Sequence, residues 1–172
     1  MMEAQSFTID EISRKKARQP HELIMLNLAI FHLLLAVGLI ALDIGQLGML
    51  IPVLFSILLF GYIYWRGGQF NPITEWFVMV NWRQALLRGR LLFIGYGLTA
   101  LIITLAQLMA EGDKAEIFQV VFTRIGVMPT VILVFAVLVL ESSSLEQISR
   151  GRVPVGMLRR YPPPQEVNQS AG

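Results

Sequence analysis

The sequence predicts an all-α membrane protein, a four-span transmembrane helical bundle with an interfacial amphipathic helix between its second and third spans. Of the 172 residues, 55% are hydrophobic and only 15% are charged, and the mean hydropathy is +0.60. A soluble chain of this length needs many more polar residues to cover its surface. The apolar residues also gather in four long segments, and the basic residues gather in alternate connections between them. Lipid is the solvent that these three observations predict.

Each apolar segment is long enough, or nearly so, to cross a bilayer. A hydrocarbon core about 30 Å thick takes roughly 20 helical residues. The predicted spans are 23–43, 48–65, 91–110 and 117–140. We expect the first to be retained, because it is longer than the apolar region of a signal peptide. The fourth contains Arg124 and Pro129, so a re-entrant or strongly kinked segment remains an alternative for it.

The basic residues predict the orientation of the spans. The N-terminal segment 1–20, the loop between spans two and three, and the tail 142–172 hold four lysines or arginines each, whereas the other two loops hold only Lys114. Short loops rich in lysine and arginine stay in the cytoplasm. We therefore expect an integral, multi-pass protein of a bacterial inner membrane, with both termini and the middle loop in the cytoplasm.

The middle loop contains the predicted interfacial helix, at about 72–88. It begins after Asn71 with a proline, a favourable helix start, and its apolar residues recur at helical spacing. The candidate contacts with the membrane surface or with a partner are Trp76, Phe77, Trp82, Arg83 and Arg88. The alternative is that this helix only connects two spans. In the tail, a short helix is expected to start near Ser143, and residues after 151 are expected to be largely disordered because prolines and glycines interrupt them.

Polar residues inside the predicted spans form stripes. His21, His32 and Asp43 recur every eleven residues, which puts them within about 40° of one another on a helix, whereas Asn27 is expected on the opposite side. The fourth span carries Gln119, Thr123, Gly126 and Thr130 on one side, and the third carries Tyr96, Thr99 and Gln107. Such residues let lipid-embedded helices pack closely. The candidate intramembrane functional residues are His32, Arg124, Asp43, Gln107 and Gln119.

Two of these candidates have both a functional and a structural interpretation. His32 could relay a proton, ligate a metal or contact a quinone headgroup, or it could simply hydrogen-bond a neighbouring helix. Arg124 could contact an anionic substrate, or it could extend toward the outer surface and pair with Asp43 or Glu111. We expect the structural interpretation for both.

The residues present limit the classes of function. The absence of cysteine excludes thiol chemistry and cysteine-ligated metals, and no HExxH motif, phosphate-binding glycine loop or nucleophile–base pair is visible. No cofactor, metal or nucleic acid is implied. We expect a non-enzymatic accessory subunit or assembly factor of a larger membrane complex, with the lipid bilayer and other membrane subunits, or a second copy, as partners. The alternative is a small oligomeric transporter or channel, and an enzyme acting on lipid or quinone is a weaker third hypothesis.

Overall fold

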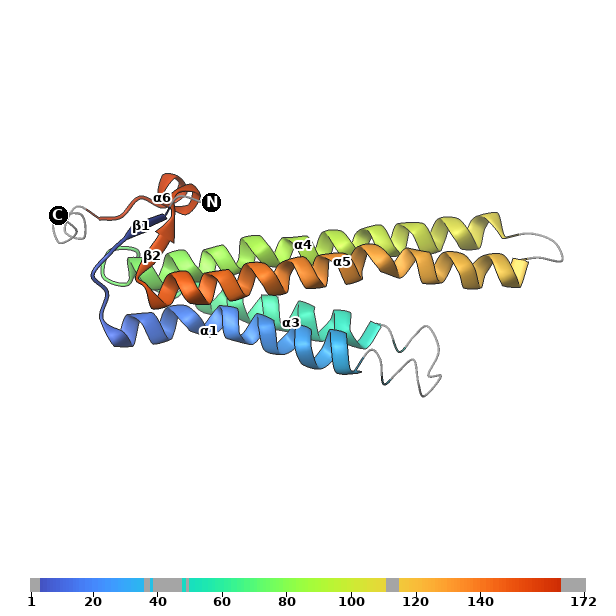
Figure 1. Ribbon diagram of the computed structural model, residues 1–172, viewed down its shortest axis with the longest axis horizontal. Coiled ribbons are helices and arrows are strands. Elements are labelled where there is room, and N and C mark those ends of the chain that lie inside the picture. Colours follow the sequence, from blue (N-terminus) through green and yellow to red (C-terminus); the bar gives the residue numbers. More distant parts are fainter. Residues whose placement is uncertain (1–3, 36–37, 39–47, 49, 111–114, 165–172) are drawn as a thin grey trace.

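The protein is a bundle of long helices capped at one end by a small two-stranded sheet (Figure 1). This computed structural model describes residues 4–35, 38, 48, 50–110 and 115–164. The elements are β1 (Ala4–Ser6), α1 (Glu11–Asn27), the π-helix η1 (Leu28–Leu35), α3 (Leu50–Gly67), α4 (Trp76–Met109), α5 (Ala115–Ser149), β2 (Arg152–Pro154) and α6 (Val155–Arg160). The all-α membrane class predicted from the sequence is consistent with this architecture.

Among the described residues, three helices are long and apolar enough to cross a membrane, namely Leu50–Gly67, Trp76–Met109 and the Val120–Ser149 part of α5. They contain most or all of the second, third and fourth predicted spans. The helix of the first predicted span is described as far as Leu35, and the rest of that span, apart from Gly38, lies outside the described residues. The fourth segment is not re-entrant, because α5 continues through Arg124 and Pro129 as one helix.

A separate interfacial helix over 72–88 is not formed, which corrects that prediction. Residues 76–88 are the first part of α4, which continues to Met109 without a break. The Arg88-Gly89-Arg90 sequence offers only a glycine as a helix breaker, and one glycine costs a helix only about 1 kcal/mol relative to alanine. The packing of Gly89 against Phe60 from α3 offsets that cost.

The strands join the two ends of the chain. β1 and β2 pair antiparallel, with Gln5 opposite Val153, and the Phe7 amide donates to the Gly151 carbonyl at 2.9 Å. Gly151 has a φ of 63°, and a Cβ there would lie 2.5 Å from the Phe7 carbonyl oxygen, so the turn requires glycine. We call residues 4–10 and 151–161, together with the first turns of α4, the terminal cap.

An apolar cluster fills the terminal cap. Its buried members are Phe7, Ala17, Trp76, Phe77, Val80, Ile148, Val153 and Met157. The predicted disorder after residue 151 is therefore wrong for residues 152–160, which form β2 and α6. The predicted short helix near Ser143 is likewise the last part of α5. Local composition does not predict β2 and α6, because Val153 and Met157 are buried against residues that are distant in sequence.

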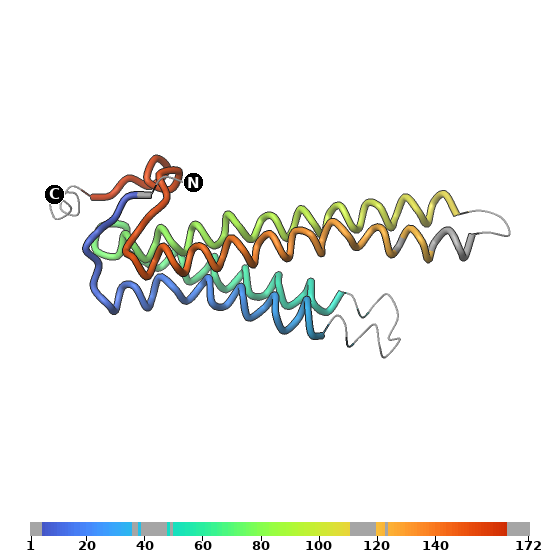
Figure 2. Tube along the Cα trace, viewed as in Figure 1, coloured from blue at the N-terminus to red at the C-terminus, as the bar shows by residue number. Residues whose placement is uncertain are grey.

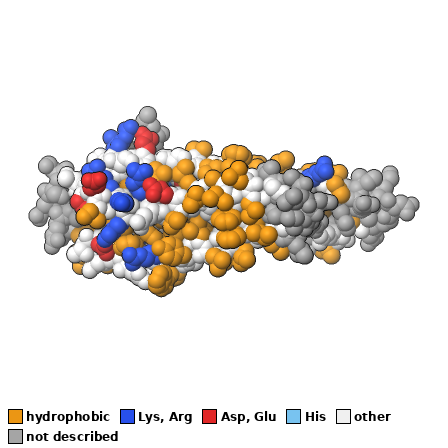
Figure 3. All heavy atoms as spheres, turned by 90° about the horizontal axis from the view of Figure 1, so that it is seen from below, with side chains coloured by type: hydrophobic (Ala, Val, Ile, Leu, Met, Phe, Trp, Pro, Cys, Tyr) orange, Lys and Arg blue, Asp and Glu red, His pale blue; other side chains and the backbone are white. Residues whose placement is uncertain are grey.

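A second apolar cluster holds the helices together. It includes Ile24, Leu28, Phe60, Ile63, Trp82, Ala85, Leu92, Val134 and Val137. Figure 2 shows α4 and α5 side by side along their length, with α1 and α3 beside the half nearer the cap. In Figure 3 most of the charged side chains in view gather at the cap end, while hydrophobic side chains cover the middle of the same face. Many large apolar side chains on the helices are exposed, which is the surface that lipid accepts.

Candidate functional site

Four polar side chains form a network between the helices at the level of His32. His32 Nε2 is hydrogen-bonded to the Tyr96 hydroxyl, which donates to Ser56 Oγ at 3.0 Å. Asn27 Nδ2 donates to the same Ser56 oxygen at 2.9 Å. The network therefore ties α1 and η1 to α3 and α4.

The prediction that Asn27 faces away from His32 is wrong. Asn27 is buried and shares the network with His32. The prediction assumed 3.6 residues per turn, but the residues after Asn27 form the π-helix η1. A π-helix bonds residue i to residue i+5, so residues five apart lie on the same side.

Tyr96→Phe is expected to lower the free energy of unfolding by about 1–2 kcal/mol, because His32 and Ser56 both lose a partner in a lipid-embedded interior. Thermal unfolding in detergent micelles, followed by circular dichroism, measures this change. Tyr62→Phe is the matched control, because Tyr62 is 46% exposed. Equal midpoints for the two variants would show that the network contributes nothing to stability.

A second polar cluster lies nearer the cap than the first and contains ionisable side chains. His21 Nδ1 from α1 contacts Glu141 Oε2 from α5, and both side chains are 0% exposed. Arg88 from α4 donates to the Leu140 carbonyl and to Ser144 Oγ, and Gln84 Nε2 donates to the same hydroxyl at 3.1 Å. The cluster joins three helices. His21 Nε2 and Glu141 Oε1 have no hydrogen-bond partner among the described residues.

Glu141 is not among the candidates named from the sequence, although the sequence contains a signal for it. Gln119, Thr130 and Glu141 are eleven residues apart, so the polar stripe of the fourth span extends to Glu141. Val134 and Val137 continue the same stripe and are buried. The stripe thus identifies the side of α5 that packs inside the bundle.

The other intramembrane candidates do not join these clusters. Gln107 and Arg124 are exposed on α4 and α5, and neither makes a hydrogen bond or ion pair within the described ranges. Gln119 lies in α5, but its side chain is outside the described part of the structure, and so is the whole of Asp43. Thr99 and Thr130 do meet, with their hydroxyls 2.8 Å apart, where Gly95 lets α4 and α5 approach closely.

The predicted surface contacts are mostly interior, which corrects that interpretation. Trp76, Phe77 and Trp82 are 3%, 4% and 1% exposed. Trp76 Nε1 donates to the Tyr161 carbonyl and Trp82 Nε1 donates to the Lys16 carbonyl, both at 3.1 Å. The two ends of the chain fold over the start of α4 and cover these rings. Arg88 belongs to the buried cluster, whereas Arg83 lines an open cleft.

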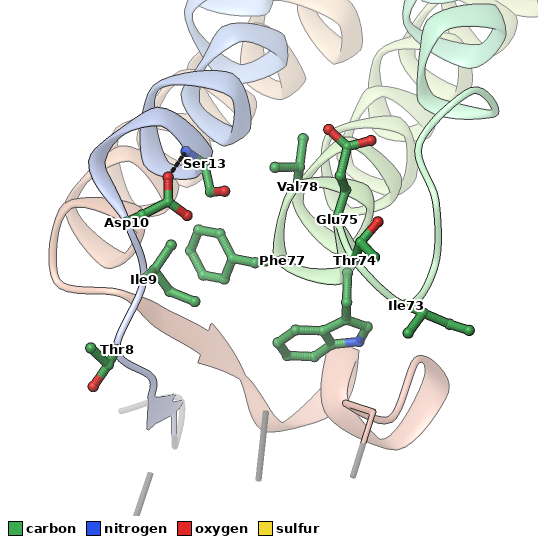
Figure 4. Close-up of a pocket in the computed structure, with 10 residues that line it drawn as sticks. Thr8, Ile9, Asp10, Ser13, Ile73, Thr74, Glu75, Phe77 and Val78 are labelled. Carbon is green, nitrogen blue, oxygen red and sulfur yellow. Dashed lines mark hydrogen bonds between the residues drawn. The ribbon is translucent and has the colours of Figure 1, made fainter. Parts of the chain in front are cut away.

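One open cleft lies in the terminal cap, between the segment before α1 and the start of α4 (Figure 4). Its volume is about 240 Å³, and it is lined by Thr8, Ile9, Asp10, Ser13, Ile73, Thr74, Glu75, Trp76, Phe77 and Val78. In Figure 4, Asp10 and Ser13 lie on the α1 side, Thr74 and Glu75 lie on the α4 side, and the Phe77 ring extends toward Ile9 and Asp10. We call it the acidic cleft, because its only charged lining groups are two carboxylates.

Both carboxylates of the acidic cleft favour the ionised form. The Ser13 amide donates to Asp10 Oδ1 at 2.8 Å, and hydrogen bonds from Ser13 lower the pKa of Asp10. The ammonium group of Lys16 lies 2.8 Å from Glu75 Oε1, and this hydrogen bond lowers the pKa of Glu75. Lys16 balances the charge of Glu75, so Asp10 supplies the unpaired negative charge of the cleft at neutral pH, and this charge suits a basic group.

The lowered pKa of Glu75 predicts a pH-dependent stability. Its contribution is fully present above the pKa of Glu75 in the unfolded chain and is lost as the pH falls through the lower pKa of the folded protein. Between about pH 6 and pH 3 the unfolding midpoint of Glu75→Gln should fall less than that of the wild type. The effect is small, because the pair is partly exposed. Parallel pH curves for the two proteins would contradict it.

The described sites consist of two interior polar clusters and an open cleft. No group of three His, Asp or Glu side chains that could hold a metal ion occurs in the residues described. The polar groups of the two interior clusters mainly bond one another across helices, whereas the acidic cleft is open. Comparison with protein-family models, with curated proteins and with solved structures finds no match for the chain.

Proposed function

We propose that the protein is a non-enzymatic accessory subunit or assembly factor of a larger membrane complex, which it contacts through the terminal cap. One observation carries this proposal: the two ends of the chain and the start of α4 fold into one unit that exposes the acidic cleft. A unit with its own apolar cluster presents a fixed surface, which separate disordered segments would not. A partner segment that carries a lysine or arginine beside an apolar residue fits this cleft.

We also propose that the chain spans a bacterial inner membrane four times, with the terminal cap on the cytoplasmic side. The pairing of β1 with β2 supports an even number of crossings, because it holds both ends of the chain at one end of the bundle. Three helices are able to cross, so the segment before α3 supplies the fourth crossing. The excess of basic residues at the cap end supports the cytoplasmic side. Reporter tags at the two ends should both report from the cytoplasm, and opposite compartments would overturn this topology.

Site-specific crosslinking tests the partner. A photo-crosslinking residue in place of Thr74, in the full chain at native expression, should give one defined crosslinked product in intact membranes. The double variant Asp10→Asn with Glu75→Gln should lose most of it, and asparagine keeps the helix cap that Asp10 provides. Glu22→Gln with Glu146→Gln is the matched control, because it removes the same charge from exposed pairs outside the cleft. No product, or equal loss in both variants, would contradict the proposal.

The small oligomeric transporter remains the alternative. It is supported by the exposed polar side chains of Gln107 and Arg124 on apolar helices, which a second copy would cover. Solute flux into reconstituted vesicles that is lost in Arg124→Ala or His32→Ala would favour it. Equal flux in the wild type and the variants would show that neither residue takes part in transport.

A further inference from the structure

We propose that a second cleft, at the boundary between the apolar band and the cap, binds the phosphate headgroup of one anionic phospholipid. The cleft has a volume of about 200 Å³ and lies between α3, α4 and the end of α6. Its lining residues are Phe60, Tyr64, Arg83, Leu86, Leu87, Arg90, Phe93, Arg160 and Tyr161. We call it the arginine cleft.

The charge of the arginine cleft suits a phosphodiester. Three guanidinium groups, those of Arg83, Arg90 and Arg160, line it, and no carboxylate does. Among the described residues, Arg83 and Arg90 make no hydrogen bond or ion pair, and Arg160 lies over the Tyr161 ring at 5.7 Å. A guanidinium group binds phosphate with two parallel hydrogen bonds. The arginines are thus available donors for one anionic group.

The apolar lining indicates a lipid and not a free phosphate ion. Phe60, Leu86, Leu87 and Phe93 form the rest of the cleft, and Phe93 is exposed beside the apolar surface of α4. The acyl chains of a phospholipid would continue over that surface, where Ile94 and Leu98 are also exposed. Inorganic phosphate would use none of this apolar surface.

The position of the cleft along α4 also matches a headgroup. Arg83 and Arg90 are seven residues apart, about 10 Å along the helix axis, and Phe93 lies within the apolar run that follows them. Tyr64 on α3 is exposed at the same cleft, and tyrosine is typical of the membrane interface. Basic pockets between spans on the cytoplasmic side recognise anionic headgroups. This inference does not depend on the proposed protein partner.

A lipid titration tests the proposal. The full chain, delipidated in a mild maltoside detergent, is titrated with dioleoylphosphatidylglycerol or with dioleoylphosphatidylcholine, and bound lipid is counted by native mass spectrometry. We expect one phosphatidylglycerol to bind preferentially. Arg83→Gln with Arg90→Gln should weaken its binding about tenfold or more. The control pair Arg152→Gln with Arg159→Gln removes the same charge from exposed positions of the cap outside the cleft, and should change binding less than about twofold.

Three results would overturn the proposal. Equal loss in the test and control pairs would mean that general surface charge attracts the lipid. Equal binding of the two lipids would remove the role of the anionic headgroup. Displacement of the lipid by inorganic phosphate or glycerophosphoglycerol at the lipid's own concentration would identify a soluble anion as the ligand. Unchanged thermal midpoints of the test variants show that any loss of binding does not come from unfolding.

Discussion

Replacing Glu141 with alanine is expected to lower the free energy of unfolding by about 3 kcal/mol, because it leaves a buried ring nitrogen of His21 without its hydrogen-bond partner. Both side chains are 0% exposed, and His21 Nδ1 has Glu141 Oε2 as its hydrogen-bond partner. Arg88 would lose the nearby carboxylate as well. Denaturation of the full chain in detergent micelles, followed by circular dichroism, measures the change.

The matched control is Glu146→Ala on the same helix. Glu146 forms an exposed pair with Arg150, which directly follows α5, and such pairs are worth about 0.3–0.5 kcal/mol. A small effect at Glu141, comparable to that at Glu146, would mean that the buried pair does not hold α1 against α5.

A double replacement separates pairing from packing. His21→Leu with Glu141→Met removes both members of the pair and keeps the site filled with apolar atoms. Replacing both partners of a buried hydrogen bond by apolar groups of similar shape is often nearly neutral or stabilising, so the double variant should recover most of the loss seen in Glu141→Ala. If it remains as unstable as the single variant, the two side chains contribute through separate partners, and the pair is not the stabilising unit.

The sequence predicts where long apolar helices occur, because the length of an apolar segment is a local property. The beginning of α3 and the end of α4 lie within two residues of their predicted positions. The stripe of Thr130 and Gly126 likewise predicts the packed side of α5, since the side chains on one face follow from helical periodicity.

The terminal cap could not be predicted in this way. β1 has three residues and no partner nearby in sequence, and it pairs with β2 only because α5 returns the chain to the same end of the bundle. The burial of Trp76 and Phe77 has the same origin, since Phe7 from the N-terminal segment contacts Trp76 at a ring-centroid distance of 5.2 Å. An isolated amphipathic helix and a helix covered by distant segments have the same apolar pattern.

The buried His21–Glu141 pair could be predicted from the sequence only in part. Periodicity places each residue on the inner side of its helix, but it does not state that the two sides meet at the same height. Whether His21 and Glu141 lie at the same level of the bundle depends on how far α5 extends beyond its apolar segment. α5 ends at Ser149, nine residues after the predicted span. The functional consequence is that α1 and α5 are held together directly beneath the cap that carries the acidic cleft.

Gly89→Ala is expected to lower the free energy of unfolding by about 3 kcal/mol, at the upper end of the usual range for an overpacked interior. An added Cβ would lie 2.0 Å from Phe60 Cε1 and 2.4 Å from Cζ, inside any real contact distance. The Phe60 ring is buried in the apolar cluster between α3 and α4. Because Gly89 is helical, alanine would otherwise stabilise α4 slightly, so a loss must come from the collision with Phe60.

Gly97→Ala is the matched control for this substitution in the same helix. No atom lies within 4 Å of a Cβ added at Gly97, so this variant should be unchanged or more stable by up to about 1 kcal/mol. Phe60→Leu combined with Gly89→Ala should recover part of the loss, because the smaller side chain makes room for the new methyl group. Thermal midpoints in one detergent compare all the variants. If Gly89→Ala behaves like Gly97→Ala, α3 and α4 do not approach as closely as their packing at Phe60 requires.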